Sequence, residues 1–322
     1  MRQAGRYMSE YRAIRETHTL LDICSQPELA AEVTLQPVNA LGVDAAIIFA
    51  DILLPLVPMG MDLEFAAGAG PILHNPLRDR AAIDALRDID PEESLKPTLD
   101  ALTLVRRELD GKVALIGFAG GPFTLASYAI EGGSSRDYRT TKTLMYREPE
   151  TWDVLMDKVA RMTAAYLRAQ VRAGAQCVQL FDSWAGALSP DDYRRFVLPA
   201  TTRIVQEVKP EGAPVIVFGT GTGGMLDVMA EAGSQVVGAD WRVDVDRAWD
   251  MIGHDRAIQG VLFAPLDEVR PRVQSILNRA DDRPGHIFNL GHGILPQTPV
   301  DTVRAVVEMV HEMSARDLPT GT

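Results

Sequence analysis

Four arginines lie within the first fifteen residues, at Arg2, Arg6, Arg12 and Arg15. A guanidinium group is a planar fork that binds a carboxylate or phosphate through two hydrogen bonds. Gly5 beside Arg6 indicates an unusual backbone conformation or a close approach to another group. A solvated, frayed terminus is the other interpretation. Because the chain as a whole is acidic, with a formal net charge of −12, this local cluster predicts a site for an anionic ligand.

Three further polar residues follow apolar runs that are typical of buried strands. Asp51 follows the run IIFA, so its carboxylate is partly desolvated unless cations surround it; a helix N-cap or a loop aspartate is the alternative. Ser183 ends another run without a GxSxG motif, which favours a hydrogen-bonding serine over a nucleophile. His292 stands between two glycines at the end of the last run, where a core histidine is not expected. These three residues are therefore candidates for a common site.

A glycine-rich stretch over 117–124 precedes Tyr128. It matches neither GxGxxG nor GxxxxGK[ST], so a dinucleotide or P-loop site is weakly supported, although its glycines could bring backbone N–H groups close to a ligand. Tyr128 taken alone is more often a packed aromatic residue than a ligand. The stretch 132–136 (GGSSR) is typical of a mobile loop that closes over a substrate.

The elements that must position these residues alternate along the chain. Continuous apolar runs predict strands covered on both faces, as in parallel sheets. Seven such runs are present: 43–51, 113–120, 176–183, 214–219, 235–240, 257–263 and 286–293. Helical patterns lie between them at 27–41 (interrupted by Pro37), 91–109, 149–173, from Ser189 onward, 222–232, 265–280 and 299–314.

This alternation predicts a single (β/α)₈ barrel domain over residues 1–322, with a doubly wound open sheet as the alternative. The seven runs are one short of eight, and we expect the missing first strand at or before Met1. In such barrels the active site lies at the carboxyl ends of the strands, where the candidate residues are placed.

Composition limits the function further. The 322 residues are 46% hydrophobic and 24% charged, which is ordinary for a soluble globular enzyme. No membrane span or signal peptide is visible, so we expect a cytoplasmic protein. The acidic balance argues against a general nucleic-acid binder. Only Cys24 and Cys177 are present, and no metal-binding motif is found.

Six segments in this order, MRQAGRYMSEYR, PELAAEVTLQPV, DAAIIFADIL, GFAGGPFTLASY, LFDSWAG and NLGHGILP, resemble the uroporphyrinogen decarboxylase family. The resemblance covers essentially the whole chain. It implies a (β/α)₈ barrel without a cofactor, generally a homodimer. It also implies an enzyme of haem biosynthesis that removes CO₂ from the acetate side chains of uroporphyrinogen III, giving coproporphyrinogen III.

The resemblance also implies the site. Asp51 is expected to face the pyrrole N–H groups, and Arg2 and Arg6 are its implied catalytic partners. The residues implied to line the substrate cleft are Arg2, Gln3, Ala4, Gly5, Arg6, Arg15, Asp51, Tyr128, Ser183 and His292. The family normally has its first strand before the opening motif, and an Asn after the Gly of the segment QGVL at 259–262, where this chain has Val261.

Two other functions remain open from the sequence. A methyltransferase of the same superfamily needs a zinc site with histidine and cysteine ligands, which Cys24 and Cys177 do not supply. A tetrapyrrole-binding protein without catalytic activity is the second alternative. An acidic protein with a local arginine cluster is consistent with a substrate that carries eight carboxylates.

Overall fold

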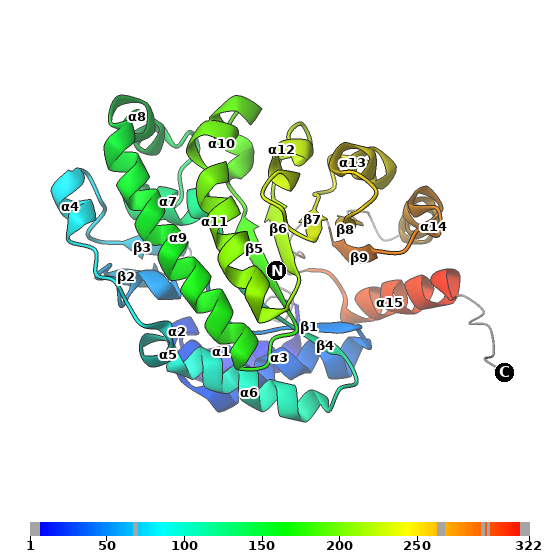
Figure 1. Ribbon diagram of the computed structural model, residues 1–322. Coiled ribbons are helices and arrows are strands. Elements are labelled where there is room, and N and C mark those ends of the chain that lie inside the picture. Colours follow the sequence, from blue (N-terminus) through cyan, green and yellow to red (C-terminus); the bar gives the residue numbers. More distant parts are fainter. Residues whose placement is uncertain (1–6, 67–69, 263–267, 291–293, 295–296, 316–322) are drawn as a thin grey trace.

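A computed structural model describes residues 7–66, 70–262, 268–290, 294 and 297–315 of the chain. Its centre is a curled parallel sheet of seven strands in the order β1-β4-β5-β6-β7-β8-β9, with helices packed around its outer face (Figure 1). These strands are β1 (Ala45–Ile47), β4 (Ala114–Gly120), β5 (Cys177–Asp182), β6 (Val215–Gly219), β7 (Val236–Gly238), β8 (Ala257–Leu262) and β9 (His286–Leu290). Each falls within one of the seven predicted runs, and the barrel-like α/β fold is confirmed.

The helices of the first half are α1 (Ser9–Thr17), α2 (Leu20–Ser25), α3 (Pro27–Leu41), α4 (Arg80–Asp84), α5 (Pro91–Ser94), α6 (Lys96–Leu109), α7 (Pro122–Glu131), α8 (Arg139–Arg147) and α9 (Pro149–Arg172). Those of the second half are α10 (Pro190–Phe196), α11 (Leu198–Val208), α12 (Leu226–Ala230), α13 (Val245–Ile252), α14 (Val269–Ala280) and α15 (Val300–Ser314). Three short 3₁₀ helices, η1 (Leu54–Leu56), η2 (Ala185–Ala187) and η3 (Lys209–Glu211), lie in connections.

Several helix predictions need correction. Pro37 does not interrupt its helix, because α3 runs through it and ends at Gly42 in the left-handed conformation. The predicted helix 91–109 is two helices, α5 and α6, and Pro97 lies in the first turn of α6, where a proline removes no intrahelical hydrogen bond. The glycine-rich stretch leads directly into α7, which the sequence did not predict.

An antiparallel hairpin, β2 (Leu63–Ala66) with β3 (Gly70–Leu73), is inserted between β1 and α4. It contacts the segment that was predicted to be a mobile loop: the N–H of Leu73 donates to the carbonyl of Gly132 at 2.8 Å. The Arg78 guanidinium, which follows the hairpin, donates to the carbonyl of Ile130 at 2.6 Å. The hairpin therefore holds the carboxyl end of α7.

Aromatic and amide side chains fill the interior of the curled sheet. Phe181 makes edge-to-face contacts with Phe118 and Phe218 on the neighbouring strands, with ring centroids 5.5 and 5.9 Å apart. The buried carboxamides of Gln179 and Gln259 meet at 3.2 Å, across β6 and β7. Because each amide can both donate and accept, the pair satisfies polar groups that are shielded from water.

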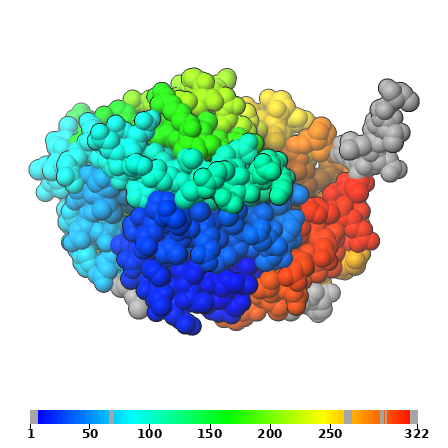
Figure 2. Space-filling model, turned by 90° about the horizontal axis from the view of Figure 1, so that it is seen from below, coloured from blue at the N-terminus to red at the C-terminus, as the bar shows by residue number. Residues whose placement is uncertain are grey.

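Strands β1 and β9 are the edges of the sheet as described, and an apolar cluster lies beside both. It contains Tyr7, Tyr11 and Ile294, with Phe49 packed against it. The ends of the described chain also meet outside the sheet: Arg304 of α15 donates to the carbonyl of Ala40 in α3 at 2.9 Å, and the blue and red segments adjoin in Figure 2. The predicted strand at or before Met1 lies outside the described residues.

Among the described residues, no helix is both long and apolar enough to cross a bilayer.

Candidate active site

The carboxyl ends of β1, β4, β5 and β6 approach one another closely because glycines stand where they meet. A Cβ on Gly120 would lie 3.2 Å from the Cβ of Ile52, and a Cβ on Gly121 would lie 2.3 Å from the Cβ of Asp182. A Cβ on Gly186, after β5, would lie 2.2 Å from the carbonyl oxygen of Thr220, after β6. Real Cβ atoms essentially never come within 3.0 Å of another heavy atom, and 3.2 Å is tighter than most of their contacts, so these glycines allow the strand ends, called the rim below, to lie close together.

Asp182, the last residue of β5, is only 1% exposed. Its Oδ1 accepts hydrogen bonds from the backbone N–H of Thr124 at 2.8 Å and from the Thr124 hydroxyl at 2.7 Å. Its Oδ2 accepts from the N–H of Phe123 at 3.4 Å. Helix α7 has Gly121 as its N-cap residue and therefore no capping side chain of its own. The carboxylate of the neighbouring strand takes that place, where the helix dipole favours negative charge.

Burial raises the pKa of Asp182 to about 6, although the hydrogen bonds from Thr124 and Phe123 act in the opposite direction. The carboxyl group is therefore mostly ionised at neutral pH and can accept all three hydrogen bonds. The sequence did not point to this residue, because an aspartate at a strand end carries no signal of the helix it will cap.

Tyr128 lies on α7 and is buried against Trp184, which follows β5. Their rings are stacked, with centroids 3.9 Å apart and planes 29° from parallel. Tyr138 packs against the same indole, with centroids 5.1 Å apart. Ser183 is half-buried between Asp182 and Trp184. Tyr128 and Ser183, both predicted from the sequence, are thus brought to the same corner of the rim.

Asp51 is half-buried after β1, and its Oδ1 accepts the N–H of Leu53 at 2.9 Å. This bond orders the turn that leads into η1, whose N-cap residue is Leu53 without a capping side chain, so Asp51 lies in a loop and does not cap a helix. Arg15 is exposed on α1 and donates to the carbonyl of His18 at 3.0 Å. Burial raises the pKa of the Cys24 thiol most, Asp51 adds to this increase and Arg15 opposes it, so both residues lie near the same buried cysteine.

Arg2, Gln3, Ala4, Gly5, Arg6 and His292 lie outside the described residues. Their chain neighbours are described, however. Tyr7 follows Arg6, and Ile294 lies two positions after His292. In the same way, Phe49 lies two positions before Asp51, which is itself described. Tyr7, Ile294 and Phe49 belong to one apolar cluster.

A second buried aspartate lies further along the rim, after β7. Asp240 follows β7, is 1% exposed, and accepts the N–H of Gly221 at 2.6 Å. It also forms an ion pair with Arg242, whose guanidinium lies 4.6 Å from the centre of the Trp241 ring. These residues border a hollow of about 380 Å³ lined by Gly221, Gly223, Gly224, Trp241, Arg242, Val243, Asp244, Arg247 and Met251. The sequence analysis did not predict this hollow.

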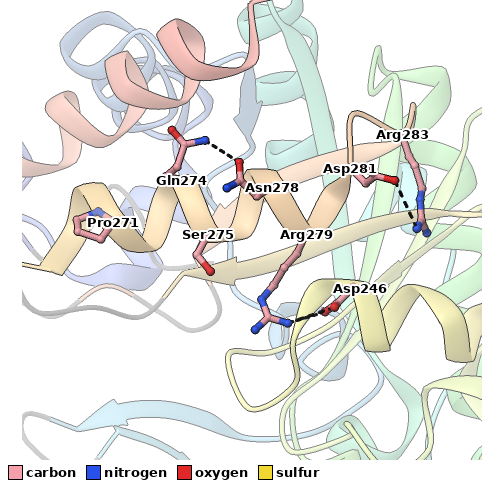
Figure 3. A pocket seen from close by; sticks show the side chains of 8 residues that line it. All are labelled: Asp246, Pro271, Gln274, Ser275, Asn278, Arg279, Asp281 and Arg283. Carbon is pink, nitrogen blue, oxygen red and sulfur yellow. Dashed lines mark hydrogen bonds and ion pairs between the residues drawn. The ribbon is translucent and has the colours of Figure 1, made fainter.

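A larger and more open hollow of about 700 Å³ lies between α13, α14 and the turn into β9 (Figure 3). Its polar side chains come from the two outer helices and the turn, and Arg279 of α14 pairs with Asp246 of α13 at 3.1 Å. None of the predicted site residues that the structure describes lines it. We therefore place the candidate active site at the strand ends.

Comparison with known proteins shows to which family the chain belongs. The model of the family described as uroporphyrinogen decarboxylase (URO-D) matches residues 1–313. The chain belongs to the uroporphyrinogen decarboxylase family. A uroporphyrinogen decarboxylase from Sorangium cellulosum is 57% identical over 323 residues, covering 99% of the chain and 92% of that protein. One from Carboxydothermus hydrogenoformans is 53% identical over 320 residues, covering 98% of the chain and 91% of that protein.

A solved structure agrees with the barrel-like fold of this uroporphyrinogen decarboxylase family member. A methyltransferase from Methanosarcina mazei has a TM-score of 0.78 at 20% sequence identity, covering 92% of the chain and 90% of that structure. At this identity the likeness concerns the fold alone.

The two cysteines of this family member are separated in the fold. Cys24 is buried in α2, and Cys177 begins β5 at the end of the strand opposite Asp182. Burial raises the pKa of each thiol to about 12, so both are protonated at neutral pH. Within the described part of the chain, no group of three His, Cys, Asp or Glu side chains is arranged to hold a metal ion.

Proposed function

We infer that this member of the uroporphyrinogen decarboxylase family is a carboxy-lyase that converts uroporphyrinogen III to coproporphyrinogen III. In each of the four reactions an acetate side chain becomes a methyl group, so one CO₂ leaves and one proton is taken up. The carbon–carbon bond breaks only if its electron pair has a place to go. Protonation of a pyrrole ring carbon creates a cation that accepts this pair.

After CO₂ departs, the exocyclic carbon is protonated and the ring carbon releases its proton. The macrocycle itself therefore serves as the electron sink, and the protein has to bind, orient and stabilise charge. A carboxylate aimed at the pyrrole N–H groups stabilises the cation electrostatically. We assign this role to Asp51.

We propose Arg2 and Arg6 as the other two catalytic residues. A guanidinium group there can orient the departing carboxylate or deliver a proton. The residues proposed to bind the substrate are Arg2, Gln3, Ala4, Gly5, Arg6, Arg15, Asp51, Tyr128, Ser183 and His292. One observation carries this proposal: Tyr7, Phe49 and Ile294 pack in a single cluster. These are near neighbours in the chain of Arg6, Asp51 and His292, so three separate sequence motifs lead into one region.

Tyr128 has a more specific proposed role. Trp184 covers one face of its ring and the side chain is 9% exposed, so we propose that Tyr128 acts through its hydroxyl group rather than by stacking on the macrocycle. Ser183 is proposed to donate or accept a hydrogen bond at the same corner of the rim.

An anaerobic assay tests the function. Purified protein is incubated with uroporphyrinogen III, and the products are separated by their number of carboxyl groups. We expect the seven-, six- and five-carboxylate intermediates and the four-carboxylate product. Tight binding of uroporphyrinogen without loss of CO₂ would favour the tetrapyrrole-binding alternative instead.

We also propose a homodimer with the two clefts near the interface, located in the cytoplasm. Family membership alone supports this proposal. Sedimentation at micromolar concentration measures the mass directly, and a monomer would contradict it.

A further inference from the structure

The Thr124 hydroxyl joins two parts of the rim that lie about sixty residues apart in the chain. It donates a hydrogen bond to Asp182 Oδ1 at 2.7 Å and accepts one from the backbone N–H of Trp184 at 3.1 Å. Asp182 and Trp184 are the two residues that flank Ser183. A single hydroxyl group therefore binds both neighbours of Ser183, Asp182 through its side-chain carboxylate and Trp184 through its backbone N–H.

Thr124 and Tyr128 lie on the same helix, and both contact residues that flank Ser183 or follow it. Residues four apart lie on the same face of a helix, so Tyr128 is one turn after Thr124 on α7. Its ring stacks on Trp184, with the centroids 3.9 Å apart. Trp184 therefore contacts α7 at two places, through its N–H at Thr124 and through its indole at Tyr128. A shift of α7 along β5 would break the hydrogen bonds and the stack together.

A helix is ordinarily capped by the side chain of its own N-cap residue, but here the N-cap residue is a glycine. The capping carboxylate comes from the next strand of the sheet, and the position that it approaches, Gly121, has no Cβ. Burying a carboxylate costs free energy, and here burial raises its pKa to about 6. A buried network in which all partners are satisfied specifies one geometry.

We propose that Asp182 and Thr124 are positioning residues that set where Ser183 and Tyr128 stand relative to the substrate. They do not themselves contact the reacting atoms. The proposal rests on the proposed function, because it concerns the decarboxylation of uroporphyrinogen. It predicts that loss of the Thr124 hydroxyl lowers turnover without a matching loss of folded protein.

Three variants separate positioning from general stability. Thr124→Val keeps the shape of the side chain and removes the hydroxyl. Thr124→Ser keeps the hydroxyl and is the rescue variant. Thr163→Val is the matched control, because Thr163 is also fully buried in a helix and its hydroxyl has no hydrogen-bond partner.

We expect kcat of Thr124→Val to fall on the order of tenfold to a hundredfold, with a smaller change in KM, because a small misplacement of oriented groups strongly slows a reaction. Thr124→Ser is expected to recover most of this loss, and Thr163→Val to match the parent protein. Equal kcat values in Thr124→Val and Thr163→Val, or no recovery in Thr124→Ser, would overturn the proposal.

A spectroscopic measurement tests the geometry without any turnover. Each variant is compared with its Trp184→Phe counterpart by near-ultraviolet circular dichroism, and the difference is the signal of the Trp184 indole in its contacts with Tyr128 and Tyr138, called here the stack signal. We expect this signal to change in Thr124→Val but not in Thr163→Val or Thr124→Ser. If the parent protein fails to decarboxylate uroporphyrinogen, the proposed function is wrong. An unchanged stack signal in Thr124→Val shows separately that the positioning network is wrong.

Discussion

The indole of Trp184 lies on the phenol ring of Tyr128, with their centroids 3.9 Å apart. This stack joins the carboxyl end of β5 to helix α7, and it leaves the Tyr128 hydroxyl as the group proposed to meet the substrate. Offset stacking between aromatic rings stabilises such an arrangement by about 0.5–1.5 kcal/mol beyond the burial of area. The ring is thus a fixed support for a polar contact.

Tyr128→Phe should weaken substrate binding while leaving the stack intact. Loss of one neutral hydrogen bond costs about 0.5–1.5 kcal/mol, which corresponds to roughly a two- to thirteenfold loss of affinity. Binding of uroporphyrinogen to the folded variant measures this. Tyr146→Phe is the control, because that hydroxyl bonds Asp192 on the exterior and the side chain is half exposed. Equal affinities of the two variants would contradict the hydroxyl role.

Asp51→Asn should lower kcat on the order of 10²–10³-fold, as expected for loss of one preorganised electrostatic group. The fold should persist, because the amide oxygen can still accept the N–H of Leu53. Asp51→Glu should also be impaired, since the added methylene moves the carboxylate by about an ångström.

Asp90→Asn is the control for Asp51→Asn. Asp90 Oδ1 accepts the N–H of Glu92 at 2.9 Å, in the same local arrangement, at the start of α5. Turnover of uroporphyrinogen is measured for each folded variant. Nearly normal activity in Asp51→Asn would rule out charge stabilisation by this residue.

Arg2→Ala and Arg6→Ala should each reduce affinity for the octacarboxylate substrate by about 1.5–3 kcal/mol, the usual value of a hydrogen bond to a charged group. Arg107→Ala is the control: it removes the same charge from the exposed face of α6, where Arg107 pairs only weakly with Glu108. Titration with substrate at fixed ionic strength measures the effect. Early melting with unchanged affinity in the folded fraction would mean that the two arginines are structural.

The Asp182 carboxyl group should make stability depend on pH. Its pKa is about 6 in the folded protein, against 3.8 for the ordinary value. Between these values the folded protein holds a proton that the unfolded chain has released, so this group contributes less to the free energy of unfolding as the pH rises from about 4 to about 6. Asp182→Asn does not titrate in this range.

The free energy of unfolding of Asp182→Asn, minus that of the parent protein, should therefore increase by about 2 kcal/mol between pH 4 and pH 7, since most but not all of a shift of about two pKa units acts above pH 4. Urea unfolding at several pH values measures this difference, with Asp153→Asn on the exposed face of α9 as the control. A difference that stays constant with pH would show that the carboxyl group is not shifted upward.

The sequence alone determined the family, the alternation of strands and helices, and the strand ends at which chemistry is expected. These follow from local patterns: apolar runs mark the seven buried strands, and polar residues directly after them mark the rim. Asp51, Tyr128 and Ser183 could be named in this way, because each stands at or just beyond a recognisable strand or motif.

Only the tertiary structure decided which groups hold the rim together. Asp182 caps a helix that begins about sixty residues earlier in the chain, and Gly121 makes room for it. Nothing in the local sequence indicates this pairing, because it depends on the neighbouring positions of β4 and β5 in the parallel sheet. The continuation of α3 through Pro37 also could not be predicted locally, since packing of its buried face outweighs the one hydrogen bond that proline removes.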